Sequence, residues 1–160
     1  MAELEKAVGE IEIHAISAGA TLPLRLEVLR PGRPVESAKF PGDDAPGTRH
    51  FGAFRNGQLL GIASLYLAEM PERRGLPAFQ LRGMATSPGA RGTGLGRALV
   101  HACIAFTMEQ GASLLWCNAR TGAVDFYRKL GFENAGAEFE IADVGPHFRM
   151  LWHAGERARS

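Results

Sequence analysis

Apolar and polar residues alternate over several short stretches of the chain. Within 10–16 the apolar side chains of Ile11, Ile13 and Ala15 recur at every second position, which predicts a half-buried strand. Asn56-Gly57 between two such stretches is the strongest short signal for a β-hairpin. The remaining patterns of this kind predict strands over 49–55, 59–69, 79–86, 114–118, 133–141 and 147–152.

Three other stretches repeat apolar residues at intervals of three and four, as an amphipathic helix does. The clearest covers 94–109, with apolar positions at Leu95, Ala98, Leu99, Ala102, Cys103 and Phe106. A second helix is expected over 21–29, with Thr21 as N-cap and one face formed by Leu22, Leu26 and Leu29. A third helix covers 124–130, and Gly131 follows it where a left-handed cap residue is needed.

The order of these elements is strand, helix, three strands, helix, strand, helix and two strands. Helices that join neighbouring strands favour parallel pairing, so we expect a mixed α/β fold that is locally parallel around the last two helices. The Pro- and Gly-rich stretch 30–48 is expected to be an irregular connection or lid.

The composition narrows the class of protein. The chain has 160 residues, 46% hydrophobic and 22% charged, which predicts one domain over 1–160 with an arm at about 1–9 and a frayed tail at 156–160. With 18 Lys and Arg against 17 Asp and Glu, the net charge of +1 argues against a nucleic-acid-binding protein. The chain shows no apolar run near the ~20 residues of a membrane span, no secretory signal and no cysteine framework. We therefore expect a soluble, cytoplasmic protein without a membrane partner.

The segment 87–97 reads SPGARGTGLGR and lies between a predicted strand and the clearest helix. Its glycines let backbone N–H groups approach a ligand, the helix N-terminus adds partial positive charge, and Arg91 and Arg97 add formal charge. These features predict a phosphate or pyrophosphate site. A Walker loop is excluded because Arg97 and Ala98 follow Gly96, and the dinucleotide pattern starting at Gly92 fails at its sixth position.

What remains is Arg-x-x-Gly-x-Gly, formed by Arg91, Gly94 and Gly96. It resembles the acetyl-CoA signature of the GCN5-related N-acetyltransferases, in which a proline such as Pro88 commonly precedes the Arg. A second motif of that family follows at the expected distance, as Ala123, Phe126, Tyr127, Leu130, Gly131 and Phe132. The resemblance covers about 79–132 well.

This resemblance implies a mixed, mostly antiparallel sheet of about seven strands, flanked by helices and splayed between strands 4 and 5. It implies acetyl-CoA as co-substrate, with the pyrophosphate on the loop amides and the pantetheine arm along the fourth strand. The cofactor-binding residues it implies are Met84, Ala85, Thr86, Arg91, Gly92, Thr93, Gly94, Leu95, Gly96, Arg97, Asn118 and Phe126. The family often has Asn where this chain has Arg120, so Asn118 and Arg120 both remain candidates. No metal is expected, since the histidines show no ligand spacing.

By the same resemblance, Tyr127 protonates the departing CoA thiolate, whereas Phe126 beside it fits a packing role. A phenol with a pKa near ~10 is protonated at pH 7 and can act as the acid. Direct transfer to an amine also needs a base, for which Glu69 and Glu72 are candidates. His50 is another candidate base, but it is interpreted as a strand-edge histidine with no special role.

Two further features have simple structural interpretations. The pair Asp43-Asp44 is interpreted as a turn or cap, although it could attract a cationic amine. Cys117 is interpreted as buried and inert rather than nucleophilic.

The sequence thus predicts an N-acetyltransferase that moves an acetyl group from acetyl-CoA to a primary amine of a small molecule or amino acid, as a monomer or homodimer. The alternatives are a catalytically silent acetyl-CoA sensor, a protein acetyltransferase acting on lysines or N-termini, and a dimeric interaction protein formed through Trp152 and the last strands.

Overall fold

A computed structural model describes residues 9–154 of the chain as a mixed α/β fold. Its eight strands follow the order β1-β2-β3-β4-β5-β8-β6, with β7 paired to β8. Contacts divide the chain into two units, which we describe separately: 9–66 with 83–103, and 67–82 with 104–154. The expected tail, and all of the expected arm except Gly9, lie outside the described residues.

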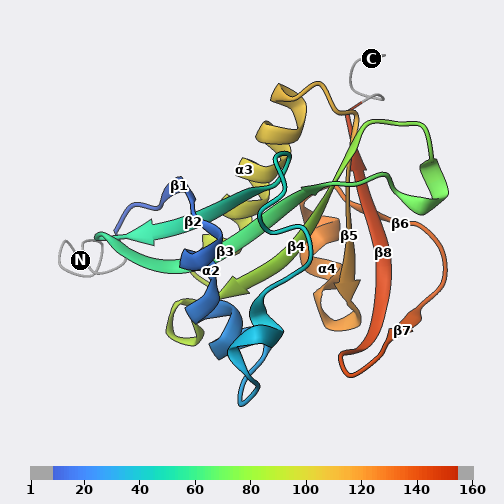
Figure 1. Cartoon of the computed structure of the whole chain (residues 1–160). Helices are drawn as coiled ribbons and strands as arrows, with labels where there is room; N and C mark the ends of the chain where they lie inside the picture. Colours follow the sequence, from blue (N-terminus) through green and yellow to red (C-terminus); the bar gives the residue numbers. More distant parts are fainter. Residues whose placement is uncertain (1–8, 155–160) are drawn as a thin grey trace. The chain divides into compact units, whose positions relative to one another are not determined.

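The first unit contains the antiparallel strands β1 (Glu12–Ile16), β2 (Arg49–Arg55) and β3 (Gln58–Leu67) (Figure 1). The predicted hairpin between β2 and β3 is confirmed: Asn56 and Gly57 have φ of 50° and 77°, the left-handed pair that a tight type I′ turn requires. This hairpin places Arg55 at the end of β2.

Helix α2 (Ala18–Leu24) continues into the π-helical turn η1 (Arg25–Leu29). The prediction of Thr21 as N-cap is wrong. Ser17 caps the helix by accepting the amide N–H of Ala20, and Thr21 lies inside, where its hydroxyl donates to a backbone carbonyl. The buried face is also different from the predicted one and consists of Thr21, Leu24 and Arg25, because tertiary packing of Leu24 against β3 and β4 decides the orientation.

The connection over 30–48 is irregular, as predicted, with one short 3-10 helix, η2 (Val35–Ala38). The strand β4 (Ala78–Thr86), the 3-10 turn η4 (Pro88–Ala90) and the helix α3 (Leu95–Glu109) then follow the predicted order. Of the apolar face expected for α3, Leu95, Leu99 and Cys103 are buried and the other positions half-buried, while Val100 and Thr107 are buried in addition. The glycine-rich segment therefore does connect a strand to the N-terminus of a long helix.

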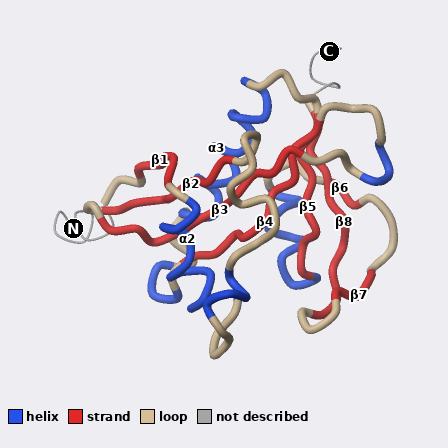
Figure 2. Tube along the Cα trace, viewed as in Figure 1, coloured by secondary structure: helices blue, strands red, loops and turns tan. Residues whose placement is uncertain are grey.

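The second unit begins with the 3-10 turn η3 (Pro71–Arg73) and contains β5 (Leu114–Arg120), η5 (Thr121–Ala123) and α4 (Val124–Lys129). β4 pairs with β5 in parallel from Ala78↔Leu114 to Leu81↔Cys117, and β5 pairs with β8 (Gly145–His153) in antiparallel (Figure 2). Its core cluster is formed by Met70, Ala78, Leu114, Trp116 and Leu151.

The single strand predicted over 133–141 is wrong. Gly136, with φ of 107°, interrupts it, and the chain forms two short strands, β6 (Glu133–Asn134) and β7 (Phe139–Ile141), both paired with β8. This interruption accounts for eight strands instead of about seven. Over 9–154, no helix is long and apolar enough to cross a membrane.

Candidate functional site

In the first unit, the loop ahead of α3 is open to solvent. Arg91, Gly92, Thr93 and Gly94 are all exposed, whereas the next residue, Leu95, is buried and fixes the start of the helix. Gly92 and Gly94 have φ of 74° and 93°, backbone conformations that a residue with a side chain rarely adopts. A Cβ at Gly92 would meet no atom within 4 Å, so its outer face is open.

The start of α3 fits an anionic ligand. The first helical hydrogen bond runs from the amide of Ala98 to the carbonyl of Gly94, and the amides before Ala98 belong to the first turn, which has no intrahelical acceptors. Arg97 is exposed, and this turn contains no acidic residue. N–H groups without intrahelical acceptors, the helix dipole and the guanidinium groups of Arg91 and Arg97 are together complementary to the negative charge of a pyrophosphate.

The side chain of Arg55, on β2, is hydrogen-bonded to this loop. Arg55 donates from Nη1 to the Thr93 hydroxyl over 2.6 Å and from Nη2 to the Thr93 carbonyl. The Thr93 hydroxyl in turn donates to the carbonyl of Ala90. Sequence reasoning missed Arg55, because 38 residues separate it from Thr93 and no local pattern connects them.

The predicted pantetheine-binding residues Met84, Ala85 and Thr86 are the last three residues of β4. Ala85 is buried and the other two are half-buried. Gly83 precedes them with φ of 65°, which interrupts the regular strand. A Cβ at Gly83 would lie 3.3 Å from the Phe40 ring and 3.4 Å from Nε of Arg25. Gly83 is therefore required by both its backbone angle and its neighbours.

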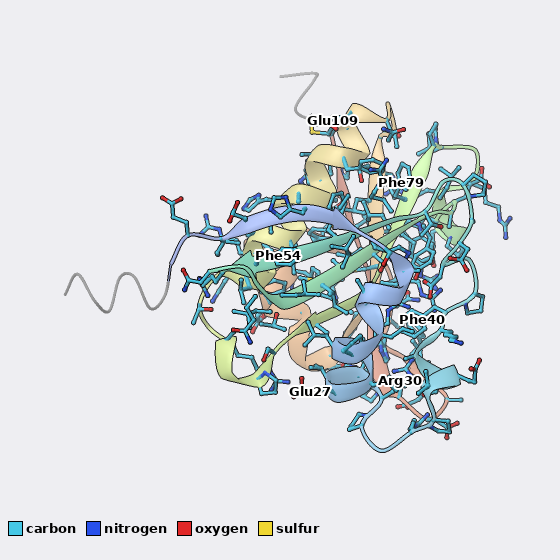
Figure 3. All side chains as sticks on the ribbon, turned by 60° about the vertical axis from the view of Figure 1, so that its left-hand side comes forward. Glu27, Arg30, Phe40, Phe54, Phe79 and Glu109 are labelled. Carbon is cyan, nitrogen blue, oxygen red and sulfur yellow. The ribbon has the colours of Figure 1, made fainter. Side chains whose placement is uncertain are left out.

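A buried polar network lies beside Gly83 in the same unit. Arg25 is fully buried and forms a two-point ion pair with Asp43, with the shorter distance, 2.7 Å, between Nη1 and Oδ2. Arg25 also donates to Ser64 and Tyr66, and the Phe40 ring (labelled in Figure 3) covers its guanidinium at 4.0 Å from the ring centroid. Sequence reasoning missed Arg25, because its partners Asp43 and Ser64 are 18 and 39 residues away.

This network fixes the roles of Asp43 and His50. The turn interpretation of Asp43 is confirmed, since Oδ2 accepts the amide N–H of Phe40. Its carboxylate is in addition committed to Arg25 and Tyr66. His50 is buried and bonds through Nδ1 to Ser64 and through Nε2 to the Asp43 carbonyl. Because a carbonyl only accepts, Nε2 carries a proton, and both ring nitrogens are engaged.

Asp43 should make the stability of the protein depend on pH. Burial opposes ionisation, but hydrogen bonds from Arg25, Tyr66 and the Phe40 amide outweigh it and hold the pKa of Asp43 below its ordinary 3.8. A lowered pKa in the folded state adds stability above the unfolded pKa, and this contribution is lost as the pH falls through the folded pKa. We expect the free energy of unfolding to fall below about pH 4. In denaturant titrations from pH 7 to 3, Asp43→Asn should show a smaller fall; an equal fall would contradict this assignment.

In the second unit, Tyr127 lies on α4 and is 6% exposed. Its ring makes edge-to-face contacts with Phe126 and Phe132, with centroids 5.0 and 5.3 Å away. Gly131, with φ of 96°, ends α4 as predicted: its amide bonds to the Arg128 carbonyl, and the next amide bonds to the Tyr127 carbonyl. The cap and the aromatic contacts hold the ring in one orientation.

Asn118 and Glu72 both accept hydrogen bonds from Arg149 in this unit. Arg149 donates from Nε to Oδ1 of Asn118 over 3.1 Å and from Nη1 to Oε2 of Glu72 over 2.7 Å. Its guanidinium also lies over the Trp116 ring at 5.3 Å from the centroid. No local pattern indicated Arg149, because its partners are 31 and 77 residues away.

The other candidate residues in this unit are Glu69, Arg120 and Cys117. Glu69 accepts the amide N–H of Gly75 over 2.9 Å and so helps to close the turn before β4. Arg120 is exposed at the end of β5. Cys117 is buried, and burial raises the pKa of its thiol to about 12, so it is a neutral thiol at pH 7. The predicted burial of Cys117 is confirmed.

Comparisons with known proteins agree with this geometry. Residues 22–132 match the model of the "Acetyltransferase (GNAT) family". The chain is 36% identical over 140 residues to the uncharacterized N-acetyltransferase YitI of Bacillus subtilis, covering 88% of this chain and 94% of YitI. It is 29% identical over 113 residues to a streptothricin acetyltransferase of Streptomyces lavendulae, covering 66% of this chain and 57% of that protein.

Solved structures show the same fold. The "IAA acetyltransferase" of Bacillus cereus superposes with a TM-score of 0.69 over 91% of this chain and 100% of its own, at 17% sequence identity. The family match, which spans more than half of the chain, and the similarity to YitI both include the glycine-rich loop and the Tyr127 helix. The chain therefore belongs to the acetyltransferase (GNAT) family and is an acetyl-CoA-dependent acyltransferase.

Proposed function

We propose that this enzyme transfers the acetyl group of acetyl-CoA directly to a primary amine of a small molecule or amino acid. The observation that carries the proposal is the exposed loop 91–94 at the N-terminus of α3. It contains two glycines with positive φ, Gly92 and Gly94, which lie between Arg91 and Arg97. We assign the pyrophosphate of acetyl-CoA to this loop and the pantetheine arm to the backbone of Met84, Ala85 and Thr86.

In the proposed reaction, the neutral amine attacks the thioester carbonyl carbon while backbone N–H groups of β4 stabilise the developing oxyanion. The C–S bond then breaks, the N-acetyl product forms, and the thiolate takes a proton from the Tyr127 hydroxyl. The proton lost by the amine goes to a base and, through solvent, restores the phenol. No covalent enzyme intermediate is involved.

Of the two candidate bases, we favour Glu72. Its Oε2 is held by Arg149, which fixes the orientation of the carboxylate, and its side chain is 45% exposed and so reachable by a substrate. Glu69 is engaged with the Gly75 amide. We also assign Asn118 and Phe126 to the CoA side of this proposal. A small acceptor is favoured over a protein because one relative is a streptothricin acetyltransferase.

Binding of acetyl-CoA can be tested by thermal unfolding. At 100 times its dissociation constant, a ligand stabilises the folded state by about 2.7 kcal/mol, which raises the Tm of a domain of this size by several degrees. We expect this shift with acetyl-CoA but not with NAD. An equal shift with NAD, or none with acetyl-CoA, would mean that the 91–96 loop does not hold CoA.

A further inference from the structure

Arg55 lies at the end of β2, outside both sequence motifs of the family. It is 7% exposed, and its three hydrogen bonds to residues within 9–154 all go to neutral oxygens: the Thr93 hydroxyl, the Thr93 carbonyl and the Gly9 carbonyl. Two of the three acceptors thus belong to a single residue of the pyrophosphate loop.

The charge of Arg55 is not compensated within the part of the chain that the structure describes. Among residues 9–154 it forms no ion pair, whereas the buried Arg25 in the same unit is paired with Asp43. A buried guanidinium without a counter-charge is costly. Loop residues 91–94 are exposed and include Thr93, to which Arg55 donates, so an anion bound at this loop would bring negative charge close to the guanidinium.

We propose that Arg55 is a positioning residue for the pyrophosphate of acetyl-CoA. Its two hydrogen bonds to Thr93 maintain the conformation of the loop, so that the first amides of α3 point toward the phosphates. It also places a fixed positive charge close to the anion. This inference rests on the proposed function, because it takes loop 91–96 to be the pyrophosphate site.

The test uses two acetyl donors and the variant Arg55→Met, which keeps the length of the side chain but removes its charge and donors. S-acetylpantetheine carries the thioester and pantetheine but lacks the pyrophosphate. We expect the Kd of acetyl-CoA to rise roughly 10- to 100-fold, as for the loss of charge-assisted hydrogen bonds. kcat at saturating acetyl-CoA and kcat/KM for S-acetylpantetheine should stay near the wild-type values.

Two further variants separate charge from geometry. Arg55→Lys keeps the positive charge but cannot form both hydrogen bonds to Thr93. It should give a Kd of acetyl-CoA between those of the wild type and Arg55→Met. Thr93→Val removes one acceptor and should weaken binding of acetyl-CoA, whereas Thr93→Ser, which keeps the hydroxyl, should restore it. Arg49→Met is the matched control: Arg49 is exposed at the opposite end of β2 and should leave both donors unaffected.

The possible results are distinct. A parallel loss of kcat/KM for both donors in Arg55→Met would show a general structural role and overturn the inference, as would an unchanged Kd for acetyl-CoA. If Arg55→Met does not fold, the Thr93→Val and Thr93→Ser pair decides the question in the same way. If the wild-type protein does not bind acetyl-CoA at all, the proposed function fails, and this inference fails with it.

Discussion

Replacing Tyr127 with Phe is expected to lower kcat by roughly 10²- to 10⁴-fold, the usual contribution of a positioned general acid. The change removes only the hydroxyl, so the ring contacts with Phe126 and Phe132 are kept and the fold should be preserved. The Kd of acetyl-CoA should stay the same, because the phenol acts on the leaving thiolate and not on the bound ground state. Steady-state kinetics and a binding titration on the same preparation measure both quantities.

Tyr66→Phe is the matched control for this prediction. Tyr66 is also a buried tyrosine, but its hydroxyl donates to Asp43 in the polar network. Its loss should reduce the free energy of unfolding by about 1–3 kcal/mol and leave kcat unchanged. Wild-type kcat in Tyr127→Phe would rule out Tyr127 as the acid, and a solvent molecule would then have to protonate the thiolate.

The second large effect concerns stability. Arg25→Met leaves the Asp43 carboxylate without its buried counter-charge, and Asp43→Asn does the same to Arg25. Breaking one side of a buried ion pair costs about 3–5 kcal/mol, a large part of the ~5–15 kcal/mol that holds a typical protein folded. Denaturant unfolding at pH 7 should show this loss in each single variant.

A double variant and a surface control complete this test. Arg25→Met combined with Asp43→Leu removes both charges and should be less destabilised than the sum of the single effects, because neither charge is left unpaired. Lys39→Met breaks the exposed Lys39–Glu36 pair and should change stability by no more than about 1 kcal/mol. Strictly additive losses at Arg25 and Asp43 would show that the two residues do not act as a pair.

The elements with strong local patterns could be predicted from the sequence. The apolar period of α3, the Asn56-Gly57 turn and the Gly131 cap each act over a few residues, and each is found where it was expected. The glycine-rich loop was found for the same reason, since its composition and its place before a helix are local properties. The pattern of 133–141 looked continuous because the effect of one glycine, Gly136, depends on tertiary pairing with β8.

The polar side chains that hold the site together could not be predicted in this way. Arg25 reaches Asp43 across 18 residues and Ser64 across 39, and Arg55 reaches Thr93 across 38. In the sequence each of these arginines looks like an ordinary surface charge, because that is what most arginines are. Their burial is a consequence of tertiary packing, because Arg25 lies in η1 and Arg55 at the end of β2, and the partners of both are distant in the sequence.

The most direct test of the account is the release of CoA thiol from acetyl-CoA in the presence of different amines. The panel should contain amino acids, polyamines and amino sugars, with lysine-containing peptides and free peptide N-termini for comparison. We predict release that saturates with at least one small amine, with intersecting double-reciprocal lines, as expected for direct transfer between two bound substrates. Release that no amine increases, or that only peptides increase, would contradict the proposed small-amine N-acetyltransferase, and parallel lines would contradict direct transfer.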